Sequence, residues 1–214
     1  MSDCCNPSGY HHYFNEREAQ RNLRAYDEKG LDKMARRLVD FLAAQGLEGR
    51  SVLEVGGGIG ALQVEMLKAG AAHVMNVELS PGYETVAAEL LEREGLRDRV
   101  DRRVGDFTDL AAGLEADDVV MNRVICCYPD MERLMTAALS TTTRFVAASF
   151  PRDTFVAKFV IAVANTYNRI RRIDFRAYVH PPEAILETAH RAGFEVAFRD
   201  QDLIWDGVVL EIAH

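Results

Sequence analysis

Cysteine is scarce in this chain. The 214 residues contain four cysteines, placed as the adjacent pairs Cys4-Cys5 and Cys126-Cys127. Adjacent pairs are a poor basis for the disulfide framework of a small secreted protein. The first residues also lack the charged and apolar regions of a signal peptide. We therefore expect a cytoplasmic protein.

Long apolar runs and an excess of positive charge are missing as well. The longest apolar run, Phe155 to Ala164, is interrupted by Lys158 and is too short to span a bilayer. The formal net charge is −8. The overall electrostatic field of such an acidic chain does not attract nucleic acid or an anionic membrane. We expect no nucleic-acid partner and no membrane span; the oligomeric state is not indicated.

What the sequence does contain is an alternation of strand and helix patterns from residue 52 onward. With 48% hydrophobic residues, the chain can fill the core of one α/β domain. The alternation predicts a doubly wound, mostly parallel sheet with helices on both faces, closed by a C-terminal antiparallel hairpin. The predicted strands are residues 52–55, 73–78, 100–104, 118–124, 145–149, 194–198 and 203–212, and the predicted helices are residues 16–28, 31–45, 61–69, 81–94, 131–139, 154–171 and 182–190.

We predict one domain, residues 1–214, with four segments. Residues 1–46 form an N-terminal lid with helices, of which the first fifteen residues are expected to be irregular. Residues 52–150 form the cofactor-binding core, residues 151–193 a helical substrate cap, and residues 194–214 the terminal hairpin. The long apolar helix at the start of the cap is expected to belong to the core and to form one wall of the substrate pocket.

The most informative segment is a short apolar strand that carries Glu54 and leads into the glycine-rich turn Gly56-Gly57-Gly58-Ile59-Gly60. Burial of a carboxylate costs several kcal/mol unless a partner compensates it, so we expect Glu54 to face a cation. The glycines allow a tight turn and a close approach of the backbone to a ligand. With Ala61 the turn also satisfies the G-x-G-x-x-A fingerprint of dinucleotide-binding proteins, so a nicotinamide enzyme stays open.

Two more acids follow the next two predicted strands. Glu78 ends the second strand, and Asp106, between Gly105 and Phe107, follows the third. The carboxyl ends of parallel strands meet at one edge of the sheet, where such folds bind their ligands. An acid at each of three successive strand ends predicts a ligand site there.

The turn with its leading acid resembles the E/D-x-G-x-G-x-G loop of class I S-adenosylmethionine-dependent methyltransferases. The resemblance implies that S-adenosylmethionine is the cofactor and S-adenosylhomocysteine the product. It places Glu54 at the methionine ammonium, Glu78 at the ribose and Asp106 at the adenine amino group. The cofactor-binding residues that it implies are Glu54, Gly56, Gly57, Gly58, Gly60, Glu78, Leu79, Gly105, Asp106, Phe107, Asn122 and Arg123.

A second resemblance covers most of the chain more loosely. Tyr13-Phe14-Asn15, the helix after Phe150-Pro151 and the tract Arg176-Ala177-Tyr178-Val179-His180 are similar to segments of the magnesium-protoporphyrin O-methyltransferase family. Cys126-Cys127-Tyr128-Pro129 resembles the His-Tyr-Pro of that family. The implied acceptor is a small molecule that is methylated on oxygen.

The tract Asn122-Arg123 lacks the Asn-Pro-Pro-Tyr motif of enzymes that methylate adenine or glutamine amines. Its residues would hold the cofactor carboxylate or an anionic substrate, or Arg123 pairs with a nearby acid. The basic cluster Arg169, Arg171, Arg172 and Arg176 either binds substrate carboxylates or is a solvated helix end.

Catalytic candidates are Tyr13, Tyr178 and His180. Methyl transfer is an in-line displacement that needs alignment and exclusion of water more than a base. Tyr13 would be a lid residue or part of a packing strap, and a histidine before two prolines is also a common helix start. Four thiols could meet if the N-terminal segment folds over the site, but adjacent cysteines chelate poorly, so no metal site is predicted. Two other functions stay open: an NAD(P)-dependent reductase, and a non-catalytic protein that binds S-adenosylmethionine.

Overall fold

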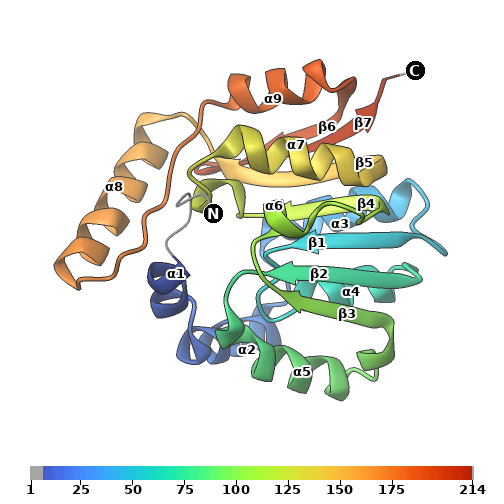
Figure 1. Ribbon diagram of the computed structural model, residues 1–214, viewed down its shortest axis with the longest axis horizontal. Helices are drawn as coiled ribbons and strands as arrows, with labels where there is room; N and C mark the ends of the chain where they lie inside the picture. Colours follow the sequence, from blue (N-terminus) through green and yellow to red (C-terminus); the bar gives the residue numbers. More distant parts are fainter. Residues whose placement is uncertain (1–6, 214) are drawn as a thin grey trace.

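The computed structural model describes residues 7–213. A seven-stranded sheet in the order β3-β2-β1-β4-β5-β7-β6 forms its centre (Figure 1). Strand β7 runs antiparallel to both of its neighbours, and the remaining pairs are parallel, which confirms the predicted sheet and its terminal hairpin. The strands are β1 Ser51–Val55, β2 His73–Glu78, β3 Val100–Val104, β4 Ala116–Asn122, β5 Thr142–Pro151, β6 Phe194–Gln201 and β7 Trp205–Ile212.

Helices cover both faces of the sheet. Successive residues of a strand point to opposite faces, so Val52 packs into a cluster with α3, α4 and α5, while Leu53 packs into a second cluster with α7 and α9. The helices are α1 Pro7–Tyr13, α2 Glu16–Lys29, α3 Lys33–Ala44, α4 Ala61–Lys68, α5 Glu84–Arg93, α6 Phe107–Leu110, α7 Met131–Thr141, α8 Phe155–Ile170 and α9 Pro182–Arg191, with 3-10 turns at Pro81–Tyr83, Arg97–Arg99 and Ile125–Cys127.

The parallel strands β1 to β4 end at one edge of the sheet, and α1 and α8 lie beyond that edge (Figure 1). Helices cover both faces of such a parallel sheet. The loops that follow its strands therefore meet at this edge. The three acids expected to form the site therefore share one end of the molecule.

The prediction of irregular structure is wrong for residues 7–13, because they form the helix α1. Its rings pack on the segment after α8: Tyr10 and Phe14 lie with their ring centroids 5.3 and 5.0 Å from that of Phe175. A Cβ on Gly9 would overlap the carbonyl oxygen of Asp174. These long-range contacts stabilise a segment whose local sequence has no helical preference.

Several element ends also differ from the prediction. Strand β4 ends at Asn122 rather than at residue 124, because Arg123 has a φ of 60° and leaves the extended conformation. Strand β7 begins at Trp205 rather than at residue 203, because the Asp202 carboxylate accepts hydrogen bonds from the backbone of Ile204 and Trp205 and forms a turn there. Strand β5 is longer than predicted, since it pairs with β7 along its length. The short helix α6 was not predicted.

The expectation that α8 belongs to the core is wrong. Phe155 and Ile170 are 84% and 73% exposed, whereas the buried residues of this helix are Ala157 and Asn168. Helix α8 has 16 residues and is the longest of the described helices. None of the helices within residues 7–213 has the length and apolar character needed to cross a membrane.

Candidate active site

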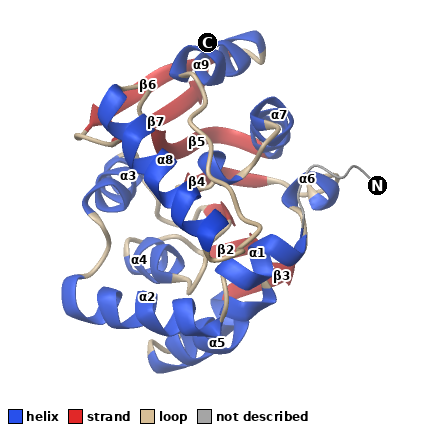
Figure 2. Cartoon of the chain, turned by 90° about the vertical axis from the view of Figure 1, so that its left-hand side faces the viewer, coloured by secondary structure: helices blue, strands red, loops and turns tan. Residues whose placement is uncertain are grey.

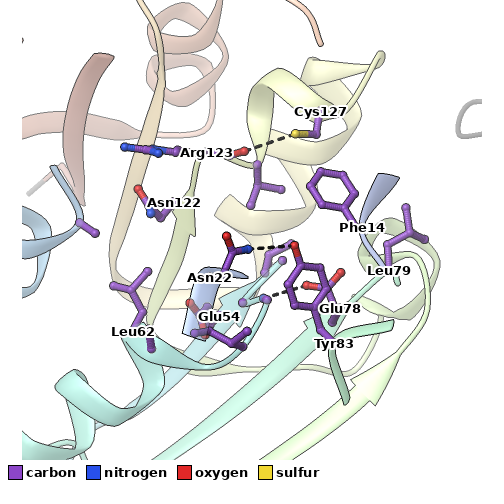
Figure 3. Close-up of a pocket in the computed structure, with 18 of the residues that line it drawn as sticks. Phe14, Asn22, Glu54, Leu62, Glu78, Leu79, Tyr83, Asn122, Arg123 and Cys127 are labelled. Atoms are coloured by element: carbon purple, nitrogen blue, oxygen red, sulfur yellow. Dashed lines mark hydrogen bonds between the residues drawn. The ribbon is translucent and has the colours of Figure 1, made fainter. Parts of the chain in front are cut away.

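A cavity of about 490 Å³ opens at the carboxyl edge of the sheet, between the ends of β1 to β4 and the N-terminal helices (Figure 3). Eleven of the twelve predicted cofactor-binding residues line it, and Gly60 is the exception. Those eleven residues are Glu54, Gly56, Gly57, Gly58, Glu78, Leu79, Gly105, Asp106, Phe107, Asn122 and Arg123.

The glycine-rich turn needs its glycines for two reasons. Gly56, Gly58 and Gly60 have φ values of 66°, 52° and 84°, which a side chain would strain. A Cβ on Gly57 would overlap the side chains of Glu54 and Asn76. Gly60 is the N-cap of α4 and faces away from the cavity, toward Gln63. It therefore contributes to the shape of the turn but not to the wall of the cavity.

Glu54 is 1% exposed, and burial raises its pKa to about 7 against the opposing hydrogen bond from Gln63 and the charge of Arg102. Its Oε2 accepts a hydrogen bond of 2.6 Å from Gln63 Nε2. The direct partner is thus a neutral amide rather than the expected cation. Because Glu54 lines the cavity, a cationic group of a ligand bound there would stabilise the charged form of this carboxyl.

Arg102 lies behind the turn and connects its parts. The side chain is only 5% exposed, pairs with Glu84 at 2.7 Å, and donates to the carbonyl of Gly58 at 2.8 Å and to Gln63 Oε1 at 3.2 Å. A chain of contacts therefore runs from Glu84 through Arg102 and Gln63 to Glu54. Networks of this kind hold side chains in one arrangement.

Glu78 is held by backbone amides. Its Oε2 accepts from Gly58 N–H and its Oε1 from Ser80 N–H, both at 2.9 Å. Burial raises the pKa of this carboxyl, and the two backbone hydrogen bonds oppose that effect. Each oxygen retains acceptor capacity for a diol.

Asp106 is the N-cap of α6 and accepts from the amide and the hydroxyl of Thr108, both at 2.9 Å. The hydroxyl of Tyr128 donates to its two oxygens at 3.1 and 3.0 Å. Tyr128 follows β4, so the loop after β4 anchors the acid that follows β3. Phe107 and Leu79 line the apolar part of the same cavity.

The side chains of Asn122 and Arg123 interact with other residues of the protein. Asn122 Oδ1 accepts from Ser149 Oγ at 2.6 Å, and its amide donates to Asp32 at 3.3 Å. Arg123 pairs with Asp32 at 3.2 Å and lies 4.5 Å above the ring of Trp205. The sequence-based alternative in which Arg123 pairs with a nearby acid is thus the one observed.

The three catalytic candidates lie elsewhere than on the wall of this cavity. Tyr13 packs on Phe175 with ring centroids 4.5 Å apart, and burial raises its pKa, to which the nearby Glu18 also contributes. Tyr178 and His180 line a second cavity of about 680 Å³ beside α8, together with Lys158, Arg169 and Arg176.

The segment that carries Tyr178 and His180 is tied to the loop after β4. Tyr178 N–H donates to the carbonyl of Cys126 at 2.7 Å, and His180 Nε2 lies 2.9 Å from the carbonyl of Tyr128. The structure thus joins the predicted cap to the loop after β4. It does not bring the three catalytic candidates together at one point.

The aromatic residues Tyr10, Tyr13 and Phe14 were expected to form a lid over the cofactor. Tyr10 in α1 and Phe14, directly after it, line the cavity, whereas Tyr13 does not. One lining residue that was not predicted is Tyr83. Tyr83 lies beside Gly58 and accepts a hydrogen bond from Asn22 at 3.2 Å.

Cys126 and Cys127 both donate to the carbonyl of Arg123 at 3.4 Å, with their sulfur atoms 3.8 Å apart. The hydrogen bond with Cys126 and burial raise the pKa of the Cys127 thiol. Cys4 and Cys5 lie outside the described residues. Within residues 7–213 no group of three or more His, Cys, Asp or Glu side chains is arranged to hold a metal ion.

Comparison with known proteins agrees with this geometry. Residues 52–146 match the family model described as "Methyltransferase domain". The structure of magnesium protoporphyrin IX methyltransferase from Synechocystis PCC 6803 with bound SAH superimposes with a TM-score of 0.78 at 19% identity, covering 98% of this chain and 100% of that chain. Residues 52–146 thus match a methyltransferase domain, and the chain has the class I methyltransferase fold. This agrees with the first resemblance drawn from the sequence, and the second is confirmed at the level of the fold.

The curated relatives match over the core alone. Erythromycin 3''-O-methyltransferase from Saccharopolyspora erythraea is 38% identical over 94 residues, which are 42% of this chain and 31% of the relative. Ribosomal protein L11 methyltransferase from Desulforamulus reducens is 32% identical over 90 residues, 41% of this chain and 29% of the relative. The chain spans about a third of the length of these two relatives.

Proposed function

We propose that this protein is an S-adenosylmethionine-dependent methyltransferase that methylates a small molecule on oxygen. The observation that carries the proposal is the convergence of Glu54, Glu78 and Asp106 on one cavity beside the glycine-rich turn. The methyltransferase domain match supports it further. An acid at the third strand end is not part of the dinucleotide fingerprint, which favours this cofactor over NAD(P).

The cavity fits the proposed cofactor group by group. Glu54, which is buried and accepts a hydrogen bond from the neutral amide of Gln63, would accept from the methionine ammonium. Glu78 would accept from the ribose hydroxyls, and Asp106 would accept from the adenine amino group. When bound, S-adenosylmethionine supplies an electrophilic methyl group on its sulfonium.

The residues of the chain would align the acceptor and exclude water, which is what an in-line displacement needs most. Tyr10 and Phe14 cover the cavity from α1. Tyr13 would orient the acceptor from the same helix, with Tyr178 and His180 acting from the cap. These three roles rest on the sequence resemblance and on the links between the cap and the loop after β4.

Two observations support the proposed class of acceptor: the names of the relatives and the basic residues beside α8. One curated relative is named as an O-methyltransferase of erythromycin, a small molecule, whereas the other is named for a ribosomal protein. The cavity beside α8 carries Lys158, Arg169 and Arg176, which would suit an acceptor with a carboxylate. We expect turnover on hydroxyl or carboxylate acceptors rather than on amines.

Calorimetric titration with S-adenosylhomocysteine and, separately, with NADH tests the proposal. We expect micromolar affinity for the former and at least tenfold weaker binding by Asp106→Ala, because a charge-assisted hydrogen bond is lost. Asp109→Ala is the matched control, since Asp109 pairs with Arg133 at the surface.

Binding of NADH alone would identify a reductase and contradict the proposal. Tight binding of S-adenosylhomocysteine without release of this product from S-adenosylmethionine across hydroxyl and carboxylate acceptors would identify the non-catalytic alternative. Tyr13→Phe then adds a second readout, because an enzyme should lose kcat at nearly unchanged cofactor affinity.

A further inference from the structure

Helix α8 has its apolar and polar faces reversed relative to an ordinary surface helix. The side that contacts the protein carries Ala157 and two asparagines, while the large apolar side chains face outward. The exposed apolar residues are Phe155, Val156, Phe159, Val160, Val163, Tyr167 and Ile170.

Specific hydrogen bonds fix this orientation. Asn165 donates to the carbonyl of Ala177 and accepts from its N–H, both at 2.8 Å. Asn168 donates to the carbonyl of Phe175 at 3.3 Å, and Ala157 is fully buried. A rotation that buried the apolar side chains would break these bonds, so the apolar stripe belongs to the folded state.

The stripe forms one continuous outer surface. Its residues recur every three to four positions along 16 residues, and the rings of Phe155 and Phe159 stack with centroids 6.4 Å apart. Figure 2 shows α8 in front of the sheet, on the outside of the molecule. None of its residues lines the 490 Å³ cavity. A continuous exposed apolar surface of this kind marks an interaction site.

The charge around the stripe differs from that of the whole chain. Residues 152–176 hold six basic residues and two acids, in a chain whose formal net charge is −8. One of the acids, Asp153, pairs with Lys158. Arg169, Arg171 and Arg172 are exposed at the end of the helix, and no acid occurs between residues 153 and 174.

From this combination we propose that α8 docks the protein on an anionic lipid surface, with the apolar stripe in the interface and the arginines at the lipid headgroups. Interfacial helices combine an apolar face that carries aromatic residues with flanking cations in this way, and anionic headgroups attract such cations. A second copy fits less well, because α8 offers its own cations no acidic partner. The proposal is independent of the acceptor, because Arg171 and Arg172, unlike Arg169, line neither cavity.

Flotation of the full chain with vesicles tests the proposal. We expect binding to vesicles of phosphatidylcholine and phosphatidylserine, little binding to pure phosphatidylcholine, and weakening by salt. Phe155→Ser with Phe159→Ser should lower the affinity at least tenfold for each ring removed from the interface. Arg171→Gln with Arg172→Gln should lower it about fivefold for each charge.

Two control variants keep the result specific. Val196→Ser removes an exposed apolar residue from the edge strand β6, and Arg17→Gln with Arg24→Gln removes two exposed charges from α2; both should bind vesicles as the parent chain does. Absence of vesicle binding, equal binding to neutral vesicles, or equal effects of control and α8 variants would overturn the proposal. So would a dimer in sedimentation equilibrium that Phe155→Ser with Phe159→Ser converts to a monomer, since the face would then join two copies.

Discussion

The hydroxyl of Tyr128 lies 3.0 Å from Oδ2 of Asp106, which links the loop after β4 to the acid after β3. Tyr128 is buried, and its carbonyl also lies 2.9 Å from His180 Nε2. Tyr128 therefore connects the proposed adenine site, the loop after β4 and the segment after α8.

Tyr128→Phe should weaken the binding of S-adenosylhomocysteine about tenfold, because a hydrogen bond to a charged group contributes about 1.5 kcal/mol or more. Calorimetric titration measures the loss, and circular dichroism checks that the fold is retained. Tyr167→Phe, at an exposed position on α8, is the control for the chemical change. An unchanged dissociation constant in Tyr128→Phe would show that Thr108 alone is sufficient to position Asp106.

Gly57→Ala should abolish measurable cofactor binding, because the added methyl group would displace Glu54 and lie 2.6 Å from Gln63 Nε2. Gly95→Ala is the control: Gly95 has a φ of 68° with nothing near the missing Cβ, so this change costs about 1 kcal/mol of backbone strain and leaves binding intact. The two variants should lose stability in thermal unfolding, but only Gly57→Ala should lose affinity. Equal affinities would mean that the turn tolerates a side chain.

The sheet and most of the cofactor site could be predicted because the information is local. Glu54 lies in the first strand, Glu78 ends the second and Asp106 follows the third, and parallel strands bring their ends together. Contacts between distant segments were not predictable in this way. The helix α1 depends on Phe175, which lies more than 160 residues further along the chain, and nothing near Tyr10 indicates that contact.

The long apolar helix shows a different limit of sequence-based prediction. Its periodicity correctly predicts a helix over residues 154–171, but a periodic apolar face does not say what covers it. The outward orientation follows from Asn165 and Asn168, whose hydrogen bonds to the segment after α8 turn the polar side inward. Gln63 and Arg102 were likewise missed, since neither belongs to the glycine motif.

Arg102→Gln should destabilise the fold by about 3 kcal/mol, because removal of one partner leaves Glu84 uncompensated and frees the carbonyl of Gly58. The neighbouring Arg103→Gln breaks an exposed pair with Asp101 and should cost less than about 1 kcal/mol. Urea unfolding of both variants measures the difference. We also expect weaker cofactor binding in Arg102→Gln alone; equal stabilities would show that the network behind the turn contributes nothing.

The stability of the ligand-free protein should fall as the pH rises from about 4.5 to about 7. Burial raises the pKa of Glu54 from 4.5 to about 7, so between these values the folded state holds a proton that the unfolded state has released. Stability falls with pH wherever the folded state binds more protons. The contribution is fully present below pH 4.5 and is lost as the pH rises, and the loss reaches about 3 kcal/mol by the end of the window.

Glu54→Gln removes the titrating group and keeps an acceptor for Gln63, so its stability should depend less on pH over that window. Glu195→Gln, at an exposed site on β6, should leave the dependence unchanged. Urea unfolding at several pH values gives the comparison. A bound ammonium group favours the charged form of Glu54, so the affinity for S-adenosylhomocysteine should rise with pH near 7 in the parent chain and not in Glu54→Gln. Parallel pH profiles of the two proteins would show that Glu54 does not face the ligand's cation.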